Sequence, residues 1–319
     1  MPTFNRVEAI GLTLEHLAAQ TLPMSEFEVV VVDDGSTDDT EEYVTQRSWA
    51  FELNYHRRNN SGAATTRNFG VAQSRAPLIL FLDSDVVADS RLLELHVESH
   101  RGLEDRLIVG RVKPWPEPSR PWYEQVVYAE GGMDYGDTAR SVPFYMTLGG
   151  NFSIARGVFD AVGGYNQSFP AAGCEETEFA YRAEQAGFSL WYQPEAIGYH
   201  NHPRSLYQRC QQQYAHMSSM ALLIAMHPQL QTVIFGVDEV MPIFSQPLSF
   251  SAARLRFTTA ILGLRPIRSA LYRSLMLVDQ RRLSPRLASM LFWQLIRGWK
   301  HAGFHHGLSL YGNHNSTGR

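Results

Sequence analysis

Two short apolar segments, each running directly into a cluster of carboxylates, constrain the fold more than any other feature of this sequence. Phe27–Val32 reads Phe-Glu-Val-Val-Val-Val and runs into Asp33–Ser36, whereas Leu78–Leu82 reads Leu-Ile-Leu-Phe-Leu and runs into Asp83–Asp85. Such segments are typical of strands buried in a parallel sheet. Between them, Gly62–Gln73 has a helical pattern. We therefore predict an α/β fold in which helices flank a mostly parallel sheet, with a ligand site beyond the carboxyl ends of these strands.

The alternation of helix and strand continues to about residue 202, and the rest of the chain is helical. Further helices are predicted at Val7–Gln20, Thr37–Arg47, Arg156–Val162 and Glu175–Gly187, with strands at Phe51–Tyr55, Ser189–Gln193 and Ile197–His200. Prolines 114, 116, 118 and 121 predict a loop before a short helix. Beyond Pro203 the pattern predicts helices at 206–227, 250–264, 267–280 and 285–302, and a polar, frayed tail from Tyr311.

Charge divides the chain at the same point. Residues 1–202 hold 15 Arg and Lys against 29 Asp and Glu, a balance of −14, whereas residues 203–319 hold 13 against 3, a balance of +10. We therefore predict two regions, 1–202 and 203–319, the second a basic helical extension. Its arginines are spread along helices without a reader motif, which argues against nucleic-acid binding.

Other features bear on where the protein works. The apolar runs are far shorter than the ~20 residues that span a bilayer, and the first residues do not resemble a signal peptide. Two cysteines, Cys174 and Cys210, cannot build a disulfide framework or a four-cysteine zinc site. We expect a cytoplasmic protein.

The Asp83-Ser84-Asp85 segment carries the clearest chemical signal. In an extended segment the two carboxylates point to one face, about 6.5 Å apart, and repel each other unless a cation lies near them. Oxygen ligands favour Mg²⁺ or Mn²⁺, completed by water and substrate phosphate. The alternative is an ordinary turn or helix cap. His200 and His202 form a His-x-His pair without a third strong zinc ligand nearby.

Three other segments carry weaker signals. Asp33 and Asp34 suit hydrogen bonds to a nucleobase or ribose, or a turn that caps the following helix. Arg67, in a helix of small residues, suits a nucleotide or a close helix–sheet contact. Glu175 and Glu176 open a helix, where one of them is a candidate general base or both only stabilise the helix dipole.

Taken in order, these motifs resemble glycosyltransferase family 2, the inverting transferases of the GT-A fold. The resemblance covers about residues 1–202. Its motifs are Pro2–Arg6, Val31–Asp38, Asn60 with Arg67 and Asn68, Phe81–Asp85, Gly150–Ser153, Val162–Tyr165 and Glu175–Phe179.

The resemblance implies a role for each matching residue. Asp34 would meet the nucleobase, with Asp33 and Thr3 nearby and Arg67 on the base or ribose. Asp85 would bind the metal directly, Asp83 would face the ribose or a metal-bound water, and His200 or His202 would reach the metal. Glu176 would be the catalytic base, with Glu175 as competitor, and a helix N-terminus should keep it ionised at neutral pH. The remaining donor-binding positions implied are Asn5, Ser84 and Asn151.

The sequence also departs from the family pattern. The buried apolar run that precedes Pro2 in the family is not in this sequence, so we expect either a start further upstream or a sheet without that strand. Glu176 stands where the family has Asp, which keeps open a catalytically inactive partner subunit that binds a sugar nucleotide. A haloacid-dehalogenase-like phosphatase, with Phe81–Val86 as its phosphoaspartate motif, would need a helper lysine, and Lys113 is the only lysine in the N-terminal region.

The expectation is thus a metal-dependent inverting transferase that moves a sugar from a nucleoside-diphosphate sugar, UDP-linked in the first instance, to a glycan or lipid-linked acceptor. The basic extension would bring it to an anionic membrane surface at the inner face, or would serve as a helical cap or dimer interface. The candidate membrane residues are Arg265, Arg268, Arg273, Phe292, Trp293 and Trp299.

Overall fold

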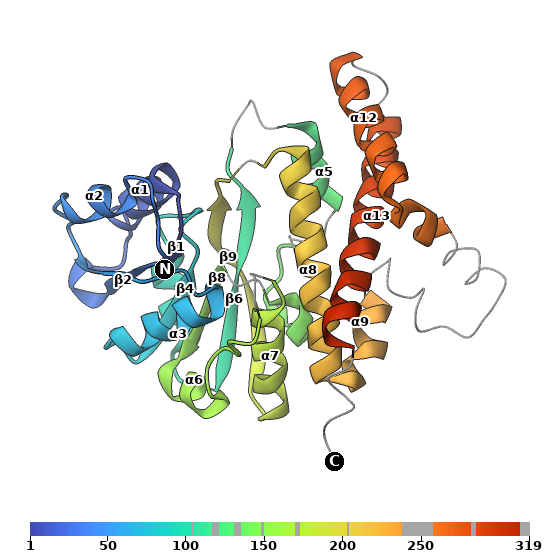
Figure 1. Ribbon diagram of the computed structural model, residues 1–319. Coiled ribbons are helices and arrows are strands. Elements are labelled where there is room, and N and C mark those ends of the chain that lie inside the picture. The colour runs from blue at the N-terminus through green and yellow to red at the C-terminus, as the bar shows by residue number, and fades with distance from the viewer. Residues whose placement is uncertain are drawn as a thin grey trace. The chain divides into compact units, whose positions relative to one another are not determined.

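The protein consists of two compact units in the computed structural model (Figure 1). The first comprises Met1–Pro170 and Glu175–Pro203, and the second Ala171–Cys174 and Arg204–Arg319. The second unit thus includes a short piece of the region that we assigned to the first. The structure describes residues 1–103, 105–116, 121–130, 135–147, 150–169, 173–202, 204–237, 258–281 and 285–312.

Two sheets form the centre of the first unit. The first is wholly parallel, in the order β1 (Pro2–Thr3), β2 (Glu28–Asp33) and β3 (Glu52–Arg57). The second is mixed and has six strands. Its order is β4 (Leu78–Leu82), β8 (Asn151–Ala155), β6 (Arg106–Pro114), β9 (Ser189–His200) and β5 (Val86–Ala88), with β7 (Arg140–Ser141) also paired to β9.

Helices cover both faces of the mixed sheet. On β8, Ser153 bonds His96 of α4 (Leu92–His100), whereas Phe152 packs against Phe179 of α7 (Glu175–Gln185). Successive residues of a strand point to opposite faces, so α4 and α7 lie on opposite sides. The other helices of this unit are α1 (Val7–Leu17), η1 (Met24–Glu26), α2 (Thr40–Thr45), α3 (Ala63–Gln73), α5 (Trp122–Glu130), η2 (Phe144–Met146) and α6 (Arg156–Val162).

The predicted apolar stripe of the first helix packs against β2 and its neighbours. Ile10 and Leu14 of α1 are fully buried in one cluster with Val29 and Val31 of β2 and Leu82 at the end of β4. Burial of such side chains stabilises a fold by roughly 1.5–3 kcal/mol each. The cluster therefore fixes the ends of β2 and β4, the two strands that carry the acidic segments.

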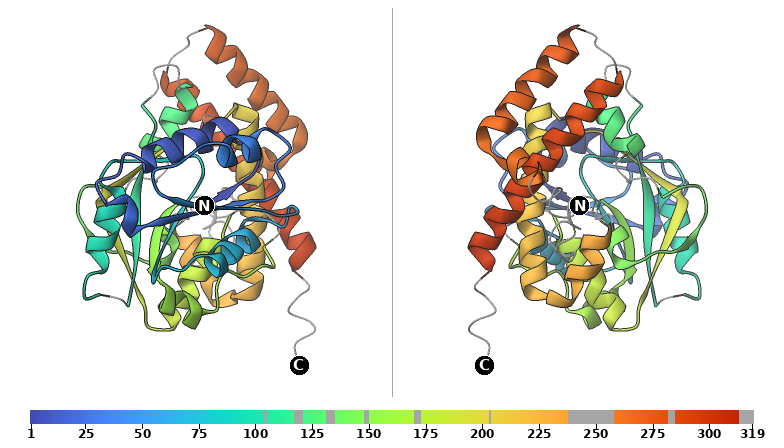
Figure 2. Two further views of the ribbon diagram at one scale, coloured as in Figure 1. Left: turned by 90° about the vertical axis from the view of Figure 1, so that its left-hand side faces the viewer. Right: turned by 90° about the vertical axis from the view of Figure 1, so that its right-hand side faces the viewer.

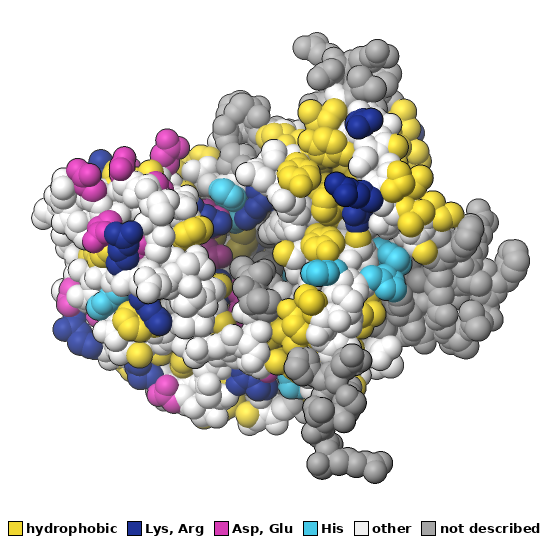
Figure 3. All heavy atoms as spheres, in the orientation of Figure 1, with side chains coloured by type: hydrophobic (Ala, Val, Ile, Leu, Met, Phe, Trp, Pro, Cys, Tyr) yellow, Lys and Arg dark blue, Asp and Glu magenta, His cyan; other side chains and the backbone are white. Residues whose placement is uncertain are grey.

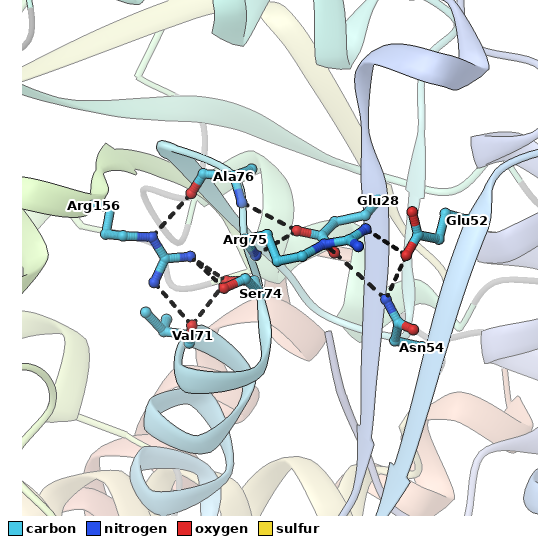
Figure 4. A network of polar contacts seen from close by, with 8 residues as sticks. All are labelled: Glu28, Glu52, Asn54, Val71, Ser74, Arg75, Ala76 and Arg156. Carbon is cyan, nitrogen blue, oxygen red and sulfur yellow. Dashed lines mark hydrogen bonds and ion pairs between the residues drawn. The ribbon is translucent and has the colours of Figure 1, made fainter.

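A network of polar contacts closes the C-terminal end of α3 (Figure 4). The Arg156 guanidinium donates to the carbonyls of Val71, Ser74 and Ala76 at 2.9–3.0 Å. These carbonyls lie in the last turn of α3 and the segment after it, where a helix leaves its own acceptors unpaired. Arg156 therefore ties the start of α6 to the turn from α3 into β4.

Strand β9 corrects the prediction of two separate strands at 189–193 and 197–200. It is one strand, and its register against β6 shifts between Gly110 and Arg111, so that Gln193 pairs with Gly110 and Ile197 with Arg111. The extra residues form a β-bulge that includes Pro194, which has no N–H to donate to the ladder. The interruption that we interpreted as a strand end is therefore a bulge.

The first strand is short. Pro2 and Thr3 pair only with Val32 and Asp33 of β2. Beside them lies a slot of about 80 Å³ between β2 and β4, lined by Met1, Pro2, Glu28, Val30, Val32, Thr66, Arg67, Gly70, Val71, Ser74, Ala76 and Leu78–Phe81.

The second unit is helical, as predicted. Its helices are α8 (Leu206–Met226), η3 (Pro228–Leu230), α9 (Gln231–Val237), a helical segment at 258–263, α12 (Arg265–Arg281) and α13 (Pro285–Tyr311), and α13 runs along α8 (Figures 1 and 2). A capping box starts α8, because Ser205 Oγ accepts from Gln208 N–H while Gln208 Oε1 accepts from Ser205 N–H. Residues 250–257 of a predicted helix, Pro118 and the tail from 313 lie outside the described residues.

Candidate active site

The carboxylates after β2 are used mainly by the protein itself. Asp33 is fully buried, with Oδ1 accepting from Ser36 N–H at 2.7 Å and Oδ2 accepting from the Tyr55 hydroxyl at 2.5 Å. This corrects the prediction that Asp33 contacts the nucleotide, since one oxygen shapes the turn and the other is bonded by Tyr55 of β3. Asp34 is 7% exposed and accepts from Ser61 N–H at 2.8 Å and from Gly62 N–H at 3.0 Å. Its carboxylate therefore orders the loop that enters α3.

Two residues of the first motif lie beside this turn. The backbone N–H of Asn5 donates to Ser36 Oγ at 2.8 Å, and Asn5 Oδ1 accepts from Thr37 N–H at 2.7 Å. Asn5 has a φ of 51°, a left-handed conformation that Asn tolerates. Thr3 is 4% exposed, and its hydroxyl has no partner within the structure. Asn5 thus positions the turn, whereas the Thr3 hydroxyl is buried.

In the second acidic segment, Asp85 lies next to two basic side chains. Arg6 Nη1 lies 2.6 Å from Asp85 Oδ2, and Asp85 is only 2% exposed. His200 Nε2 lies 3.7 Å from the same oxygen. The sheet explains this proximity, because His200 on β9 pairs with Val86 on β5, the residue after Asp85. Of the two predicted histidines, His200 is the one placed at Asp85; the ring of His202 lies 6.4 Å from that of His200.

Arg67 joins three carboxylates from two parts of the chain. Its Nη2 lies 3.0 Å from Asp83 Oδ1, and its Nη1 lies 2.8 Å from Glu175 Oε1 and 3.0 Å from Glu176 Oε1. The Arg67 side chain is 4% exposed, Glu175 1%, Glu176 15% and Asp83 31%. Arg67 therefore contacts the carboxylates, and Glu176 is the more accessible glutamate.

Burial of Glu176, together with the negative charge of Glu175, raises the pKa of Glu176 to about 8 against the lowering influence of Arg67. This overturns our expectation that the helix N-terminus keeps Glu176 ionised at neutral pH. A single guanidinium faces three carboxylates here, so one of them favours its protonated form. A group with this pKa can accept a proton from a substrate hydroxyl and release it again near neutrality.

Asn151 and Ser84 are buried rather than presented to solvent. Asn151 is fully buried, with its side-chain N–H donating to the carbonyls of Arg111 and Ala196 and Oδ1 lying 2.9 Å from His96 Nε2. This corrects the prediction of a donor contact for Asn151, which instead anchors the β9 bulge. Ser84 is 1% exposed, and its hydroxyl has no partner among the residues that the structure describes.

The sequence analysis missed several residues at this site. Arg6 was part of a recognised motif, but nothing in its spacing indicated an ion pair with Asp85. Tyr165 places its ring 5.7 Å from the Arg67 guanidinium, although only the Gly-Gly-Tyr motif marked it. Gly150 lies so close to Asp83 that a Cβ there would be 3.0 Å from Asp83 Oδ2. The glycine before Asn151 was therefore the informative residue of that motif.

The donor set at Asp85 suits a divalent cation such as Mg²⁺ or Mn²⁺ that keeps water and substrate ligands. Asp85 and His200 converge on one point, and Asp83 lies two residues away in the same segment. In the part of the chain that the structure describes, no group of three or more such ligands forms a closed cage. Octahedral Mg²⁺ or Mn²⁺ held by one or two protein ligands and a substrate phosphate fits this arrangement.

The model of the family named "Glycosyl transferase family 2" matches residues 1–163, about half of the chain. The chain belongs to glycosyltransferase family 2. Among curated relatives, a validoxylamine A glucosyltransferase of Streptomyces hygroscopicus subsp. jinggangensis is 27% identical over 288 residues, covering 81% of this chain and 66% of that protein. Glycosyltransferase AglE of Haloferax volcanii is 28% identical over 204 residues, covering 63% of this chain and 65% of that protein. The family 2 chain spans less than two thirds of the length of these relatives.

Solved structures establish the GT-A fold predicted for this family 2 protein. Mannosyltransferase PcManGT from Pyrobaculum calidifontis, in complex with GDP-Man and Mn²⁺, superposes with a TM-score of 0.59 at 19% identity, over 94% of this chain and 85% of that one. TarS residues 1–349 of S. aureus give a TM-score of 0.54 at 18% identity, over 97% of this chain and 90% of that one. At these identities the likeness concerns the fold.

No helix in the described ranges is both long enough and apolar enough to cross a membrane.

Proposed function

We propose that this family 2 protein is a metal-dependent inverting glycosyltransferase that moves a sugar from a nucleoside-diphosphate sugar to an acceptor hydroxyl. The observation that carries the proposal is that Arg67 contacts both Asp83 and Glu176 at 3.0 Å, while Asp85, two residues after Asp83, pairs with Arg6 at 2.6 Å. The candidate metal ligand Asp85 thus lies two residues from Asp83, which Arg67 connects to the candidate base Glu176.

On the donor side, the loop from Asp34 into α3 and the Thr3 hydroxyl would bind the nucleoside. Asp34 orders the loop, while the buried hydroxyls of Thr3, at the end of β1, and Ser84, just after β4, lack a partner among the described residues. A buried hydroxyl without a partner costs free energy that a bound ligand can recover. We take a UDP-sugar as the first donor to test. Among the structural neighbours, PcManGT is described with GDP-Man and TarS with UDP-GlcNAc.

On the acceptor side, Glu176 would act as the general base. Its carboxylate accepts the acceptor's hydroxyl proton while the oxygen forms a bond to the anomeric carbon, from the face opposite the diphosphate. The bond from that carbon to the diphosphate oxygen breaks, and its electron pair leaves with the nucleoside diphosphate. Arg67, itself paired with Glu175, would hold Glu176 in position. Asp85, with His200 and Asp83, would hold Mn²⁺ or Mg²⁺, which stabilises the charge on the leaving diphosphate.

The second unit would bring the protein to its acceptor. Residues 203–319 carry a net charge of +10, and exposed apolar side chains gather over its helices with basic ones among them (Figure 3). We take a glycan or lipid-linked acceptor at the inner face of an anionic membrane as the proposed setting, with the enzyme in the cytoplasm. Phe292, which we expected to face the membrane, is fully buried; among the described residues of this unit, the exposed large apolar side chains are Tyr207, Val233, Leu264, Met276, Leu287, Met290, Leu308 and Leu310.

A nucleotide panel tests the proposed function. Thermal unfolding is followed with UDP, GDP, UDP-sugars and GDP-sugars, each with and without Mn²⁺, because a ligand that binds only the folded state raises the unfolding temperature. Radiolabelled donors are then offered to lipid and glycan extracts. Metal-dependent stabilisation with product formation supports the transferase, whereas stabilisation without any product supports the sugar-nucleotide-binding subunit. If neither occurs with any donor, the proposal is wrong.

A further inference from the structure

The ion pair between Arg6 and Asp85 joins the first motif of the chain to the candidate metal ligand. Arg6 directly precedes α1, next to Asn5, whose backbone and side chain are bonded to the turn after β2. Asp85 precedes β5 on the other sheet and is 2% exposed. The Arg6 side chain is 31% exposed. The acid is therefore fixed and enclosed, whereas the base lies at the surface with room to move.

The Arg6 guanidinium and a divalent metal ion cannot both bind Asp85 Oδ2 without repelling each other. Arg6 Nη1 lies 2.6 Å from Asp85 Oδ2, the oxygen that His200 also faces at 3.7 Å and where the donor set suits a divalent cation. A metal–oxygen bond is about 2.0–2.2 Å, so a metal on this oxygen would lie within a few ångströms of the guanidinium. An arginine is always charged, and like charges at such a distance in an enclosed site repel strongly.

We propose that Arg6 competes with the divalent cation for Asp85 and, when displaced, pairs with the diphosphate of the donor. The guanidinium has a planar set of donors suited to phosphate oxygens, and the diphosphate is the group that the metal would also contact. Metal and nucleoside diphosphate then bind cooperatively. The metal releases Arg6 from Asp85, and the diphosphate gives the released Arg6 a new partner. Arg6 is thus a positioning residue that keeps the affinity for the bare metal low. This inference rests on the proposed function.

The Mn²⁺ affinity of the Arg6→Gln variant tests this exchange directly, without any turnover. Free Mn²⁺ is measured by electron paramagnetic resonance while metal is added to the full-length protein, first alone and then with saturating UDP or GDP. We expect Arg6→Gln to bind bare Mn²⁺ about 5- to 50-fold more tightly than the parent, and the gain from added diphosphate to shrink by a similar factor. Arg6→Lys keeps the charge and should stay close to the parent.

Controls separate the possible outcomes. Arg47→Gln removes an exposed arginine that pairs with Glu15 and should leave Mn²⁺ binding unchanged. If Arg6→Gln does not fold, Arg6→Met, which retains the aliphatic stem, takes its place. Unchanged or weaker binding of bare Mn²⁺ in the neutral variants overturns the competition, and an unchanged gain from diphosphate overturns the transfer to phosphate. If the parent itself does not bind any nucleoside diphosphate, the proposed function fails instead.

Discussion

At the scale of single residues, Arg67 explains why the acidic groups of the site differ from one another. One buried guanidinium faces Asp83, Glu175 and Glu176, so the positive charge cannot compensate all three carboxylates. Glu175 is the most buried of them and lies 2.8 Å from Arg67. Burial of Glu176, together with the negative charge of Glu175, raises the pKa of Glu176 to about 8, because Arg67 compensates these effects only in part. Two adjacent glutamates thus acquire different properties from their surroundings alone.

Substitution of the two glutamates by glutamine separates their roles. Glu176→Gln preserves the size of the side chain but removes the proton acceptor, so we expect turnover to fall roughly 10²–10⁴-fold while nucleotide binding changes little. Glu175→Gln should be milder in turnover. Steady-state kinetics and nucleotide titration of both variants measure this difference. If Glu175→Gln abolishes turnover and Glu176→Gln does not, the base is Glu175.

The pH dependence of turnover follows from the raised pKa. Only the ionised form of Glu176 accepts a proton, and its pKa is about 8, so kcat/KM should rise with pH up to about 8 and be lost progressively as the pH falls below it. The profile is measured between pH 5.5 and 9.5 with a fixed metal concentration. An acidic limb centred near pH 4.5 would mean that a carboxylate with an ordinary pKa is the base.

Some of these assignments were within reach of the sequence and others were not. The local patterns placed Asp85 after a strand, Arg67 within a helix and Glu176 in the first turn of a helix, because strand ends and helix starts follow from such patterns. Whether a polar residue faces a ligand or the interior depends on long-range packing. Asp33 is bonded by Tyr55 of another strand, and Asn151 by His96 of a helix 55 residues away, and neither partner is indicated by spacing.

At the scale of helices and strands, close packing against backbone explains several glycines. A Cβ at Gly303 of α13 would lie 2.2 Å from the carbonyl oxygen of Tyr214 in α8, and one at Gly307 would lie 2.6 Å from the carbonyl of Ser218. The two glycines are four residues apart and share a face of the helix. They allow α13 and α8 to approach more closely than side chains would permit.

Alanine at Gly303 should destabilise the protein although alanine favours helices. The added methyl group cannot be accommodated without moving α13 away from α8, which we expect to cost about 1–3 kcal/mol, as overpacking does elsewhere. Gly157→Ala in α6 is the matched control, because a Cβ there meets nothing within 4 Å, and it should be neutral or stabilising by up to ~1 kcal/mol. Urea midpoints measured by circular dichroism compare the two. Equal midpoints would contradict the close contact.

The sequence predicted most helices and the two apolar strands, but not the elements defined by tertiary pairing. Strand β6 lies between β8 and β9 in the mixed sheet, yet its sequence, Arg106–Pro114, follows charged residues and ends in proline, so it carried a weak local pattern. The bulge of β9 is likewise defined by tertiary pairing rather than by local sequence. Its extra residues are held by Asn151, which donates to the Ala196 carbonyl at 2.8 Å, a contact that only the assembled sheet creates.

At the scale of the whole molecule, charge and exposed apolar surface separate along the chain. The acidic region carries the candidate active site, whereas the region after residue 202 combines a balance of +10 with exposed Leu264, Met276 and Met290. Arg265 and Arg273 of α12 are also exposed. Arg268, by contrast, lies over the ring of Trp299 at 4.6 Å, so its charge is partly committed within the unit. Exposed arginines beside apolar side chains are the combination that anionic membrane surfaces attract.

Liposome binding tests whether this surface meets a membrane. We expect sedimentation with vesicles that contain anionic lipid, little with neutral vesicles, and weaker binding as salt rises, because exposed charges are screened beyond ~8–10 Å at physiological ionic strength. Replacing Arg265 and Arg273 by Glu should abolish most of the binding, since each basic residue near such a surface contributes about 1 kcal/mol. The matched control replaces the exposed Arg47 and Arg101 of the first unit by Glu and should bind like the parent. Binding that ignores lipid charge and salt, or a concentration-dependent dimer without vesicle binding, would assign these helices to a protein interface instead.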